Sequence, residues 1–121
     1  MRSIIRALPF ALWLVLGGMR VAAQPLDPPA PAMSAEQTVT VSLKDNRFRP
    51  ARLTIAAGTT VIWSNDEDDP DNAHNVISRD YRWASSDFLP GERYQHTFPT
   101  AGDYRYFCDL HGGMVGRVIV E

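Results

Sequence analysis

The chain has 121 residues, with 12 lysines and arginines against 14 aspartates and glutamates, three histidines and a single cysteine. This length allows one small domain and excludes a multidomain enzyme. The net charge is near neutral and no basic stripe is visible in the sequence. The sequence therefore lacks the clustered positive charge that is typical of nucleic-acid binding. One cysteine cannot form an internal disulfide, so packing or a bound metal has to stabilise the core of an exported chain.

Residues 1–23 have the features of a secretory signal peptide. Arg2 and Arg6 precede an apolar stretch over residues 7–19, and small residues lead up to Ala23. The apolar stretch is shorter than the ~20 residues that a helix needs to cross a bilayer. We therefore expect export, cleavage after Ala23 and no membrane span in the mature chain.

Residues 24–36 contain four prolines among small residues, a composition typical of an extended linker. The predicted folded domain is therefore residues 37–121. Removal of residues 1–23 takes away three arginines and no carboxylate, so the exported product is distinctly acidic.

Apolar and polar residues alternate with a period of two through most of residues 37–121, which predicts half-buried β-strands. Turn signals such as Asp45-Asn46, Pro90-Gly91 and Ala101-Gly102 separate these runs. No stretch has a convincing helical period. About seven to eight short strands at this spacing predict an all-β protein, a small antiparallel Greek-key β-sandwich. The alternating residues are Val39, Val41, Leu43, Leu53, Ile55, Val61, Trp63, Tyr94, His96, Phe98, Tyr104, Tyr106, Cys108, Val118 and Val120.

The segment from residue 108 to residue 114 places three metal-binding side chains in one short loop. Cys108, His111 and Met114 are separated by two residues each. The chain has to turn back between two predicted strands here, so the loop can direct all three donors at one centre. A fourth donor has to come from elsewhere, and His74 at the start of another predicted strand is the candidate.

Two histidines, one cysteine and one methionine form the ligand set of a blue-copper electron-transfer site. Zinc is disfavoured because a thioether is not among its usual ligands. A dinuclear copper centre needs a second thiolate, and an iron–sulfur cluster needs about four ligands of thiolate type. The chain has one cysteine, which excludes both.

The arrangement of these residues resembles the cupredoxins, and most of all the branch that contains plastocyanin, pseudoazurin and amicyanin. The resemblance implies that His74, Cys108, His111 and Met114 bind one type 1 copper ion. It also implies that the backbone N–H of Asn75 is directed at the Cys108 sulfur. The residues that carry the resemblance are His74-Asn75-Val76, Gly102-x-Tyr104-x-Tyr106-x-Cys108-x-x-His111-x-x-Met114-x-Gly116-x-Val118, Phe48-x-Pro50, Leu53-x-Ile55 and Gly58-x-Thr60-Val61-x-Trp63-x-Asn65.

This reading predicts a monomeric carrier of single electrons that cycles between Cu(II) and Cu(I). Together with the signal peptide, the resemblance implies a location in the periplasm. Its expected partners are redox proteins such as c-type cytochromes or a periplasmic dehydrogenase. Four protein donors leave no open position for a substrate, so we do not expect an enzyme. The alternative is a periplasmic copper carrier or storage protein, which would favour additional methionines, whereas Met114 is the only methionine of the predicted domain.

Two further features allow more than one interpretation. His96 alternates with Tyr94 and Phe98, which favours a histidine of the core over a ligand. Residues 66–71 hold five carboxylates in six positions. They form either a solvated loop or a docking surface for a basic redox partner.

Overall fold

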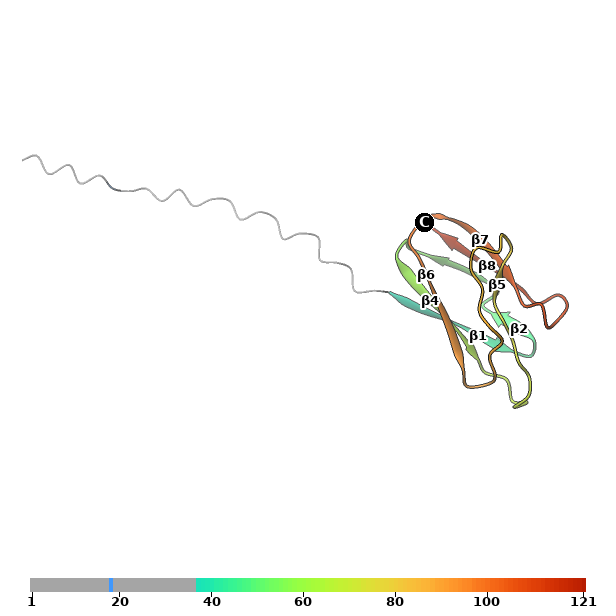
Figure 1. Cartoon of the computed structure of the whole chain (residues 1–121). Coiled ribbons are helices and arrows are strands. Elements are labelled where there is room, and N and C mark those ends of the chain that lie inside the picture. Colours follow the sequence, from blue (N-terminus) through green and yellow to red (C-terminus); the bar gives the residue numbers. More distant parts are fainter. Residues whose placement is uncertain (1–17, 19–36) are drawn as a thin grey trace, which may run out of the picture. The chain divides into compact units, whose positions relative to one another are not determined.

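A computed structural model describes residues 37–121 and the isolated Gly18 (Figure 1). The predicted signal peptide and linker otherwise lie outside the described residues. No helix in the described part is long and apolar enough to cross a membrane. The strands are β1 (Thr38–Lys44), β2 (Arg47–Arg49), β3 (Arg52–Ile55), β4 (Thr59–Asn65), β5 (Ile77–Ser78), β6 (Arg93–Phe98), β7 (Gly102–Phe107) and β8 (Val115–Val120).

These strands form two sheets of four, in the orders β2-β1-β4-β6 and β3-β8-β7-β5 (Figure 1). The predicted all-β sandwich with about seven to eight strands is confirmed. The prediction of antiparallel strands is wrong for two pairs, because β1 pairs with β4 and β3 with β8 in parallel. The chain leaves the first sheet after β2 and forms β3 in the second sheet. It then returns to the first sheet as β4, which runs parallel to β1.

Alternating side chains fill the space between the sheets, as the period of two predicts. Trp63 is fully buried, and its ring centroid lies 5.3 Å from Tyr106 and 5.7 Å from Tyr94. Burial raises the pKa of Tyr106 to about 12. Large aromatic rings make up much of the core, and each of them contributes a large buried apolar area. Its fully buried side chains include Trp63, Tyr106, Phe98, Leu43, His74, Val41, Val61, Val76, Val118 and Asn65.

His96 belongs to the edge of this aromatic core. Its ring is half-buried and stacks on Trp83, with 4.7 Å between the ring centroids and 17° between the planes. Trp83 also meets Phe98 edge-on at 5.6 Å. Burial lowers the pKa of His96, so the neutral imidazole is favoured in the folded protein.

Candidate metal centre

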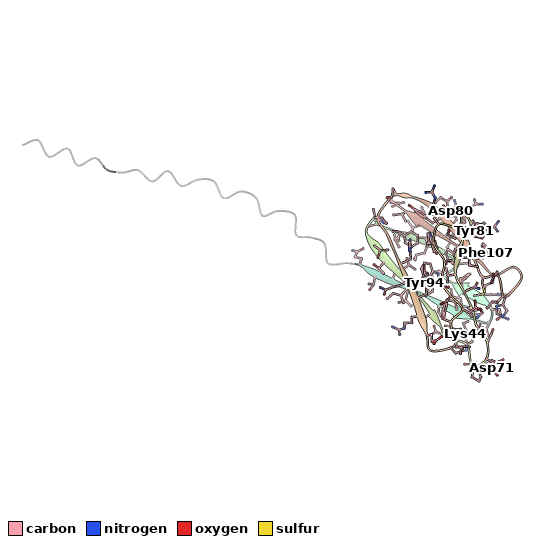
Figure 2. All side chains as sticks on the ribbon, in the orientation of Figure 1. Lys44, Asp71, Asp80, Tyr81, Tyr94 and Phe107 are labelled. Atoms are coloured by element: carbon pink, nitrogen blue, oxygen red, sulfur yellow. The ribbon has the colours of Figure 1, made fainter. Side chains whose placement is uncertain are left out.

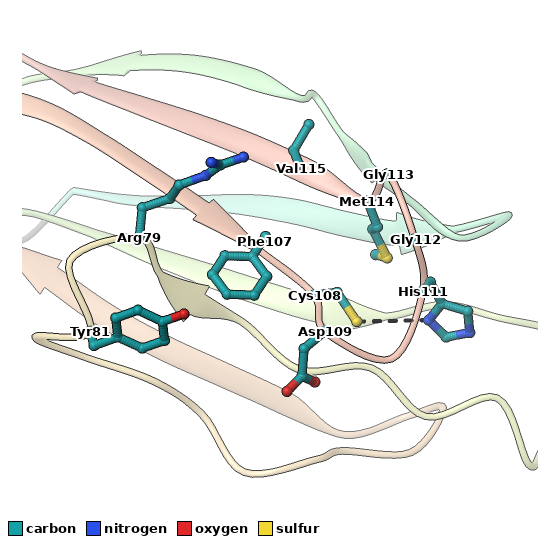
Figure 3. Close-up of a pocket in the computed structure, with 10 residues that line it drawn as sticks. All are labelled: Arg79, Tyr81, Phe107, Cys108, Asp109, His111, Gly112, Gly113, Met114 and Val115. Carbon is teal, nitrogen blue, oxygen red and sulfur yellow. Dashed lines mark hydrogen bonds between the residues drawn. The ribbon is translucent and has the colours of Figure 1, made fainter.

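The loop between β7 and β8 brings three of the predicted ligands to one place. The Cys108 backbone N–H donates to the Met114 carbonyl at 3.0 Å, and the Met114 N–H donates to the His111 carbonyl at 3.3 Å. Gly113 has a φ of 79°, a left-handed conformation that favours glycine. The loop is therefore tightly curled, and the side chains of Cys108, His111 and Met114 point toward one another (Figure 3).

The fourth candidate, His74, comes from the segment between β4 and β5. His74 and Phe88 form an isolated antiparallel bridge, in which each backbone N–H donates to the other's carbonyl, at 3.1 and 2.8 Å. The buried side-chain amide of Asn65 donates to the carbonyls of Asn72 and Phe88, both at 3.0 Å. These bonds fix both sides of the bridge, and the His74 side chain is fully buried.

The ligating atoms of His74, Cys108 and His111 all lie within 4.8 Å of one another. The Cys108 Sγ lies 3.8 Å from Nδ1 of His74 and 3.7 Å from Nδ1 of His111. For a first-row metal bonded at about 2.0 Å to nitrogen and about 2.3 Å to sulfur, trigonal angles place the two donors about 3.7 Å apart. The donor spacing therefore fits a shared metal ion.

Met114 and His111 differ in their exposure to solvent. Met114 is 2% exposed, whereas His111 is only half-buried.

A surface cavity of about 460 Å³ opens beside the loop, and its lining includes Cys108, His111 and Met114. Two imidazoles, one thiolate and a buried thioether are the donor set of a type 1 copper ion, so the residues present fit this group.

Glu67 is a site residue that sequence reasoning missed. Its Oε1 lies 2.9 Å from Nε2 of His74, and its side chain is only 7% exposed. The backbone N–H groups of Asp45 and Asn46 also donate to this carboxylate, at 3.0 and 2.8 Å. Nε2–H of His74 therefore donates to the Glu67 carboxylate. Nδ1 of His74 then carries no proton, and it faces the Cys108 sulfur.

The surroundings of these groups shift their protonation. Burial alone would raise the pKa of Glu67, but the hydrogen bonds from Asn46, His74 and Asp45 outweigh it and lower that pKa. Burial, together with the nearby His74, lowers the pKa of His111. Both shifts favour a carboxylate and a neutral imidazole, which are the forms that a metal site of this kind requires.

Asn75 braces the site through its side chain. Its Nδ2 donates to Oδ1 of Asp87 at 2.9 Å and to Oδ1 of Asp109 at 2.5 Å, while its Oδ1 accepts from the Asp109 backbone N–H at 3.0 Å. The contact that the resemblance implies between the Asn75 backbone N–H and the Cys108 sulfur stays a prediction. The side chain therefore ties the ligand loop to the segment that carries His74.

The acidic segment, residues 66–71, is more ordered by hydrogen bonds than a simple solvated loop. Asp66 accepts from the hydroxyls of Ser42 and Ser64, and Asp68 pairs with Lys44 at 2.7 Å. Glu67 turns inward to His74, as described above. His96, the remaining histidine, is not part of the metal-binding group.

Comparisons with known proteins agree with this geometry. A family model described as a cupredoxin-like domain matches residues 9–120. The chloroplastic plastocyanin of Tetradesmus obliquus is 40% identical over 87 residues, covering 61% of this chain and 58% of the plastocyanin's length. The amicyanin of Paracoccus versutus is 34% identical over 97 residues, covering 78% of this chain and 73% of the amicyanin.

The fold is similar to that of a solved purple cupredoxin from Nitrosopumilus maritimus. The TM-score is 0.61 and the sequence identity 30%, with 68% of this chain and 98% of the other chain covered.

Proposed function

Because the chain belongs to the cupredoxin-like family, we propose that His74, Cys108, His111 and Met114 bind one type 1 copper ion and that the protein carries single electrons. The observation that carries the proposal is the spacing of the three strong donors. Their atoms lie within 4.8 Å of one another, in a buried site with Met114 beside it. A copper ion held by this donor set supplies a one-electron Cu(II)/Cu(I) couple.

The protein groups around the site suit electron transfer because they hold the ligands in a fixed geometry. Glu67 fixes the tautomer of His74, and the Cys108–Met114 backbone bond fixes the ligand loop. Buried His74, Cys108 and Met114 exclude water from the inner side. The half-buried ring of His111 remains the part of the donor set that a partner can approach.

Two arguments support an electron carrier over other copper functions. Four protein donors leave no open position for a substrate, which disfavours an enzyme. A copper carrier or storage protein is the alternative function, and it would favour several methionines for handing on Cu(I). Met114 is the only methionine of residues 37–121.

We further infer that residues 1–23 direct export to the periplasm and are removed after Ala23, that residues 24–36 form a linker, and that residues 37–121 act as a monomeric domain. The apolar segment with flanking arginines supports the first inference. Redox proteins such as c-type cytochromes or a periplasmic dehydrogenase are the expected class of partner.

The experiment that tests the proposed function is the absorption spectrum of the full-length protein loaded with copper. We expect one copper per chain and an intense thiolate-to-copper band near ~600 nm. Cys108→Ser should abolish this band, while the control His96→Phe should retain it. Absence of the band from the loaded wild-type protein, or its loss in His96→Phe, would refute the assignment.

A further inference from the structure

Four arginines form a row across the sheet β3-β8-β7-β5. Arg52 pairs in register with Arg117, and Arg117 pairs with Arg105 on its other side. The Arg79 backbone N–H donates to the Arg105 carbonyl at 2.9 Å, which continues the row to the residue that follows β5. We call these four residues the arginine row. The sequence shows no basic stripe, because strand pairing assembles this one from four separate segments.

The arginine row lies on the outer face of its sheet. Tyr104, Tyr106 and Val118, the strand neighbours of Arg105 and Arg117, point into the core. Arg52, Arg79 and Arg105 are exposed, and Arg117 is half-buried. All four line one surface cavity of about 270 Å³. The guanidinium groups therefore share a single depression on the surface.

Few carboxylates neutralise the arginine row. Asp103 accepts two bonds from Arg117, from Nε at 2.7 Å and from Nη2 at 2.5 Å. Within residues 37–121, the other three arginines of the row form no ion pair with a carboxylate. The bond from Arg117 is the main cause that lowers the pKa of Asp103, and the charges of Arg105 and Arg52 lower it further. Like charges at directly opposed strand positions repel one another, so folding alone does not explain the row.

The arginine row is continuous with an aromatic patch beside the metal centre. Arg79 also lines the 460 Å³ cavity next to Cys108, together with Tyr81 and Phe107. The Tyr81 ring is 75% exposed and meets Phe107 edge-on at 6.3 Å. Figure 3 shows Arg79 and Tyr81 beside the Phe107 ring, which immediately precedes Cys108. Arginine and exposed aromatic residues are the types enriched in protein interfaces.

We propose that the arginine row, with Tyr81 and Phe107, docks the acidic surface of a redox partner protein next to the metal centre. The proposal rests on the proposed electron-transfer function. In such a complex one electron passes between the partner and the copper site, so one is oxidised and the other reduced by the same single electron. Charge complementarity gives the docking its orientation and its encounter rate.

An acidic protein fits this face better than a membrane or a nucleic acid. Residues 37–121 carry more acidic than basic side chains, so an extended polyanion would meet repulsion outside the row. Asp71 of the acidic segment lies away from this face, since Figure 2 places Asp71 at one end of the domain and Tyr81 toward the other. A short cationic row with aromatic neighbours instead suits a compact acidic patch.

The first test measures binding with a readout that does not need copper. Titration of the full-length protein with a decaglutamate peptide should shift the backbone amide signals of the arginine row, and added salt should reverse the shifts. Arg105→Glu should abolish them. The matched control Arg93→Glu, an exposed arginine on the opposite sheet with the same change in charge, should leave them intact.

The second test measures electron transfer in the copper-loaded protein. At low ionic strength, Arg105→Glu should slow oxidation of the reduced protein by hexacyanoferrate(III) by about three- to tenfold relative to Arg93→Glu. The same substitution should speed oxidation by the cation tris(phenanthroline)cobalt(III). Equal rates in the two variants would overturn the proposal.

Other outcomes separate the competing explanations. If vesicles of phosphatidylglycerol or single-stranded DNA shift the arginine-row signals and decaglutamate does not, the docking proposal is wrong. Failure of the proposed function is seen independently, as absence of the ~600 nm band from the copper-loaded wild-type protein. The peptide titration still reports on docking in that case.

Discussion

Nε2 of His74 lies 2.9 Å from Oε1 of Glu67, and neither side chain is more than 7% exposed. A buried carboxylate that accepts from one imidazole nitrogen fixes the tautomer and presents the other nitrogen as a lone-pair donor. The same carboxylate accepts two backbone N–H bonds from the turn at Asp45 and Asn46. Glu67 thus links the β1–β2 turn to the metal centre.

Replacement of Glu67 by glutamine tests this link. An amide offers one acceptor oxygen in place of two, so one of the three donors loses its partner. We expect copper affinity to fall about 10- to 100-fold. The free energy of unfolding of the metal-free protein should fall by about 1–3 kcal/mol. Competition titration with a chelator measures the copper affinity, and denaturant unfolding measures the free energy of unfolding.

Asp71→Asn is the control, because it removes an exposed charge from the same segment. It should change neither the copper affinity nor the free energy of unfolding. Equal effects in both variants would contradict the role of Glu67.

Met114→Leu separates the role of the thioether from its packing. Leucine has a similar volume, so the free energy of unfolding should change by less than about 1.5 kcal/mol. Loss of the sulfur donor should weaken stabilisation of Cu(II) more than of Cu(I) and so raise the midpoint potential. Voltammetry of the loaded variant measures this shift. An unchanged potential would show that Met114 is only a packing residue.

The two glycines of the ligand loop should respond differently to alanine. Gly113 has a φ of 79°, whereas Gly112 has ordinary backbone geometry and open space around its Cβ position. Gly113→Ala should therefore lower the free energy of unfolding by about 1–2 kcal/mol. Gly112→Ala, the matched control, should stay within about 0.5 kcal/mol of the wild type. Thermal or denaturant unfolding distinguishes them, and similar losses in both would argue against backbone strain as the cause.

The pH dependence of stability should report on His96. Burial lowers its pKa below the ordinary value, so the unfolded chain binds a proton more readily than the folded protein. The resulting stability is present above the unfolded pKa of about 6.5 and is lost as the pH falls through the folded pKa. Denaturant unfolding of the metal-free protein at pH 7.5 and pH 5 should show a smaller decline for His96→Gln than for the wild type. A decline of the same size would exclude His96 as a contributor.

The strands and the metal-binding loop could be predicted because their signals are local. Alternation along one strand decides which side chains face the core, and Trp63 and Tyr106 are buried as it predicts. Cys108, His111 and Met114 lie in one turn, so their spacing alone brings them together. His74 could be added because the donor set lacked one member, and the structure places it within reach.

Features that depend on contacts between distant segments could not be predicted. Five carboxylates between residues 66 and 71 look equivalent in the sequence, and only the path of the chain turns Glu67 inward. The parallel pairing of β1 with β4 follows from the crossing between sheets, which alternation does not encode. The arginine row depends on the register of β3, β8 and β7 and on the bond from Arg79, which follows β5, so its members come from four separate segments of the sequence.

His74 and Cys108 are 34 positions apart in the sequence, yet their Nδ1 and Sγ atoms lie 3.8 Å apart. An ion bonded to both atoms would act as a reversible cross-link that closes a long loop of chain, including β5 and β6. Free metal at 100 times its dissociation constant would add about 2.7 kcal/mol to stability. The lone cysteine, which cannot form an internal disulfide, would then join two distant segments of the chain through the metal. Copper binding would thereby add to the free energy of unfolding, in addition to supplying the redox couple.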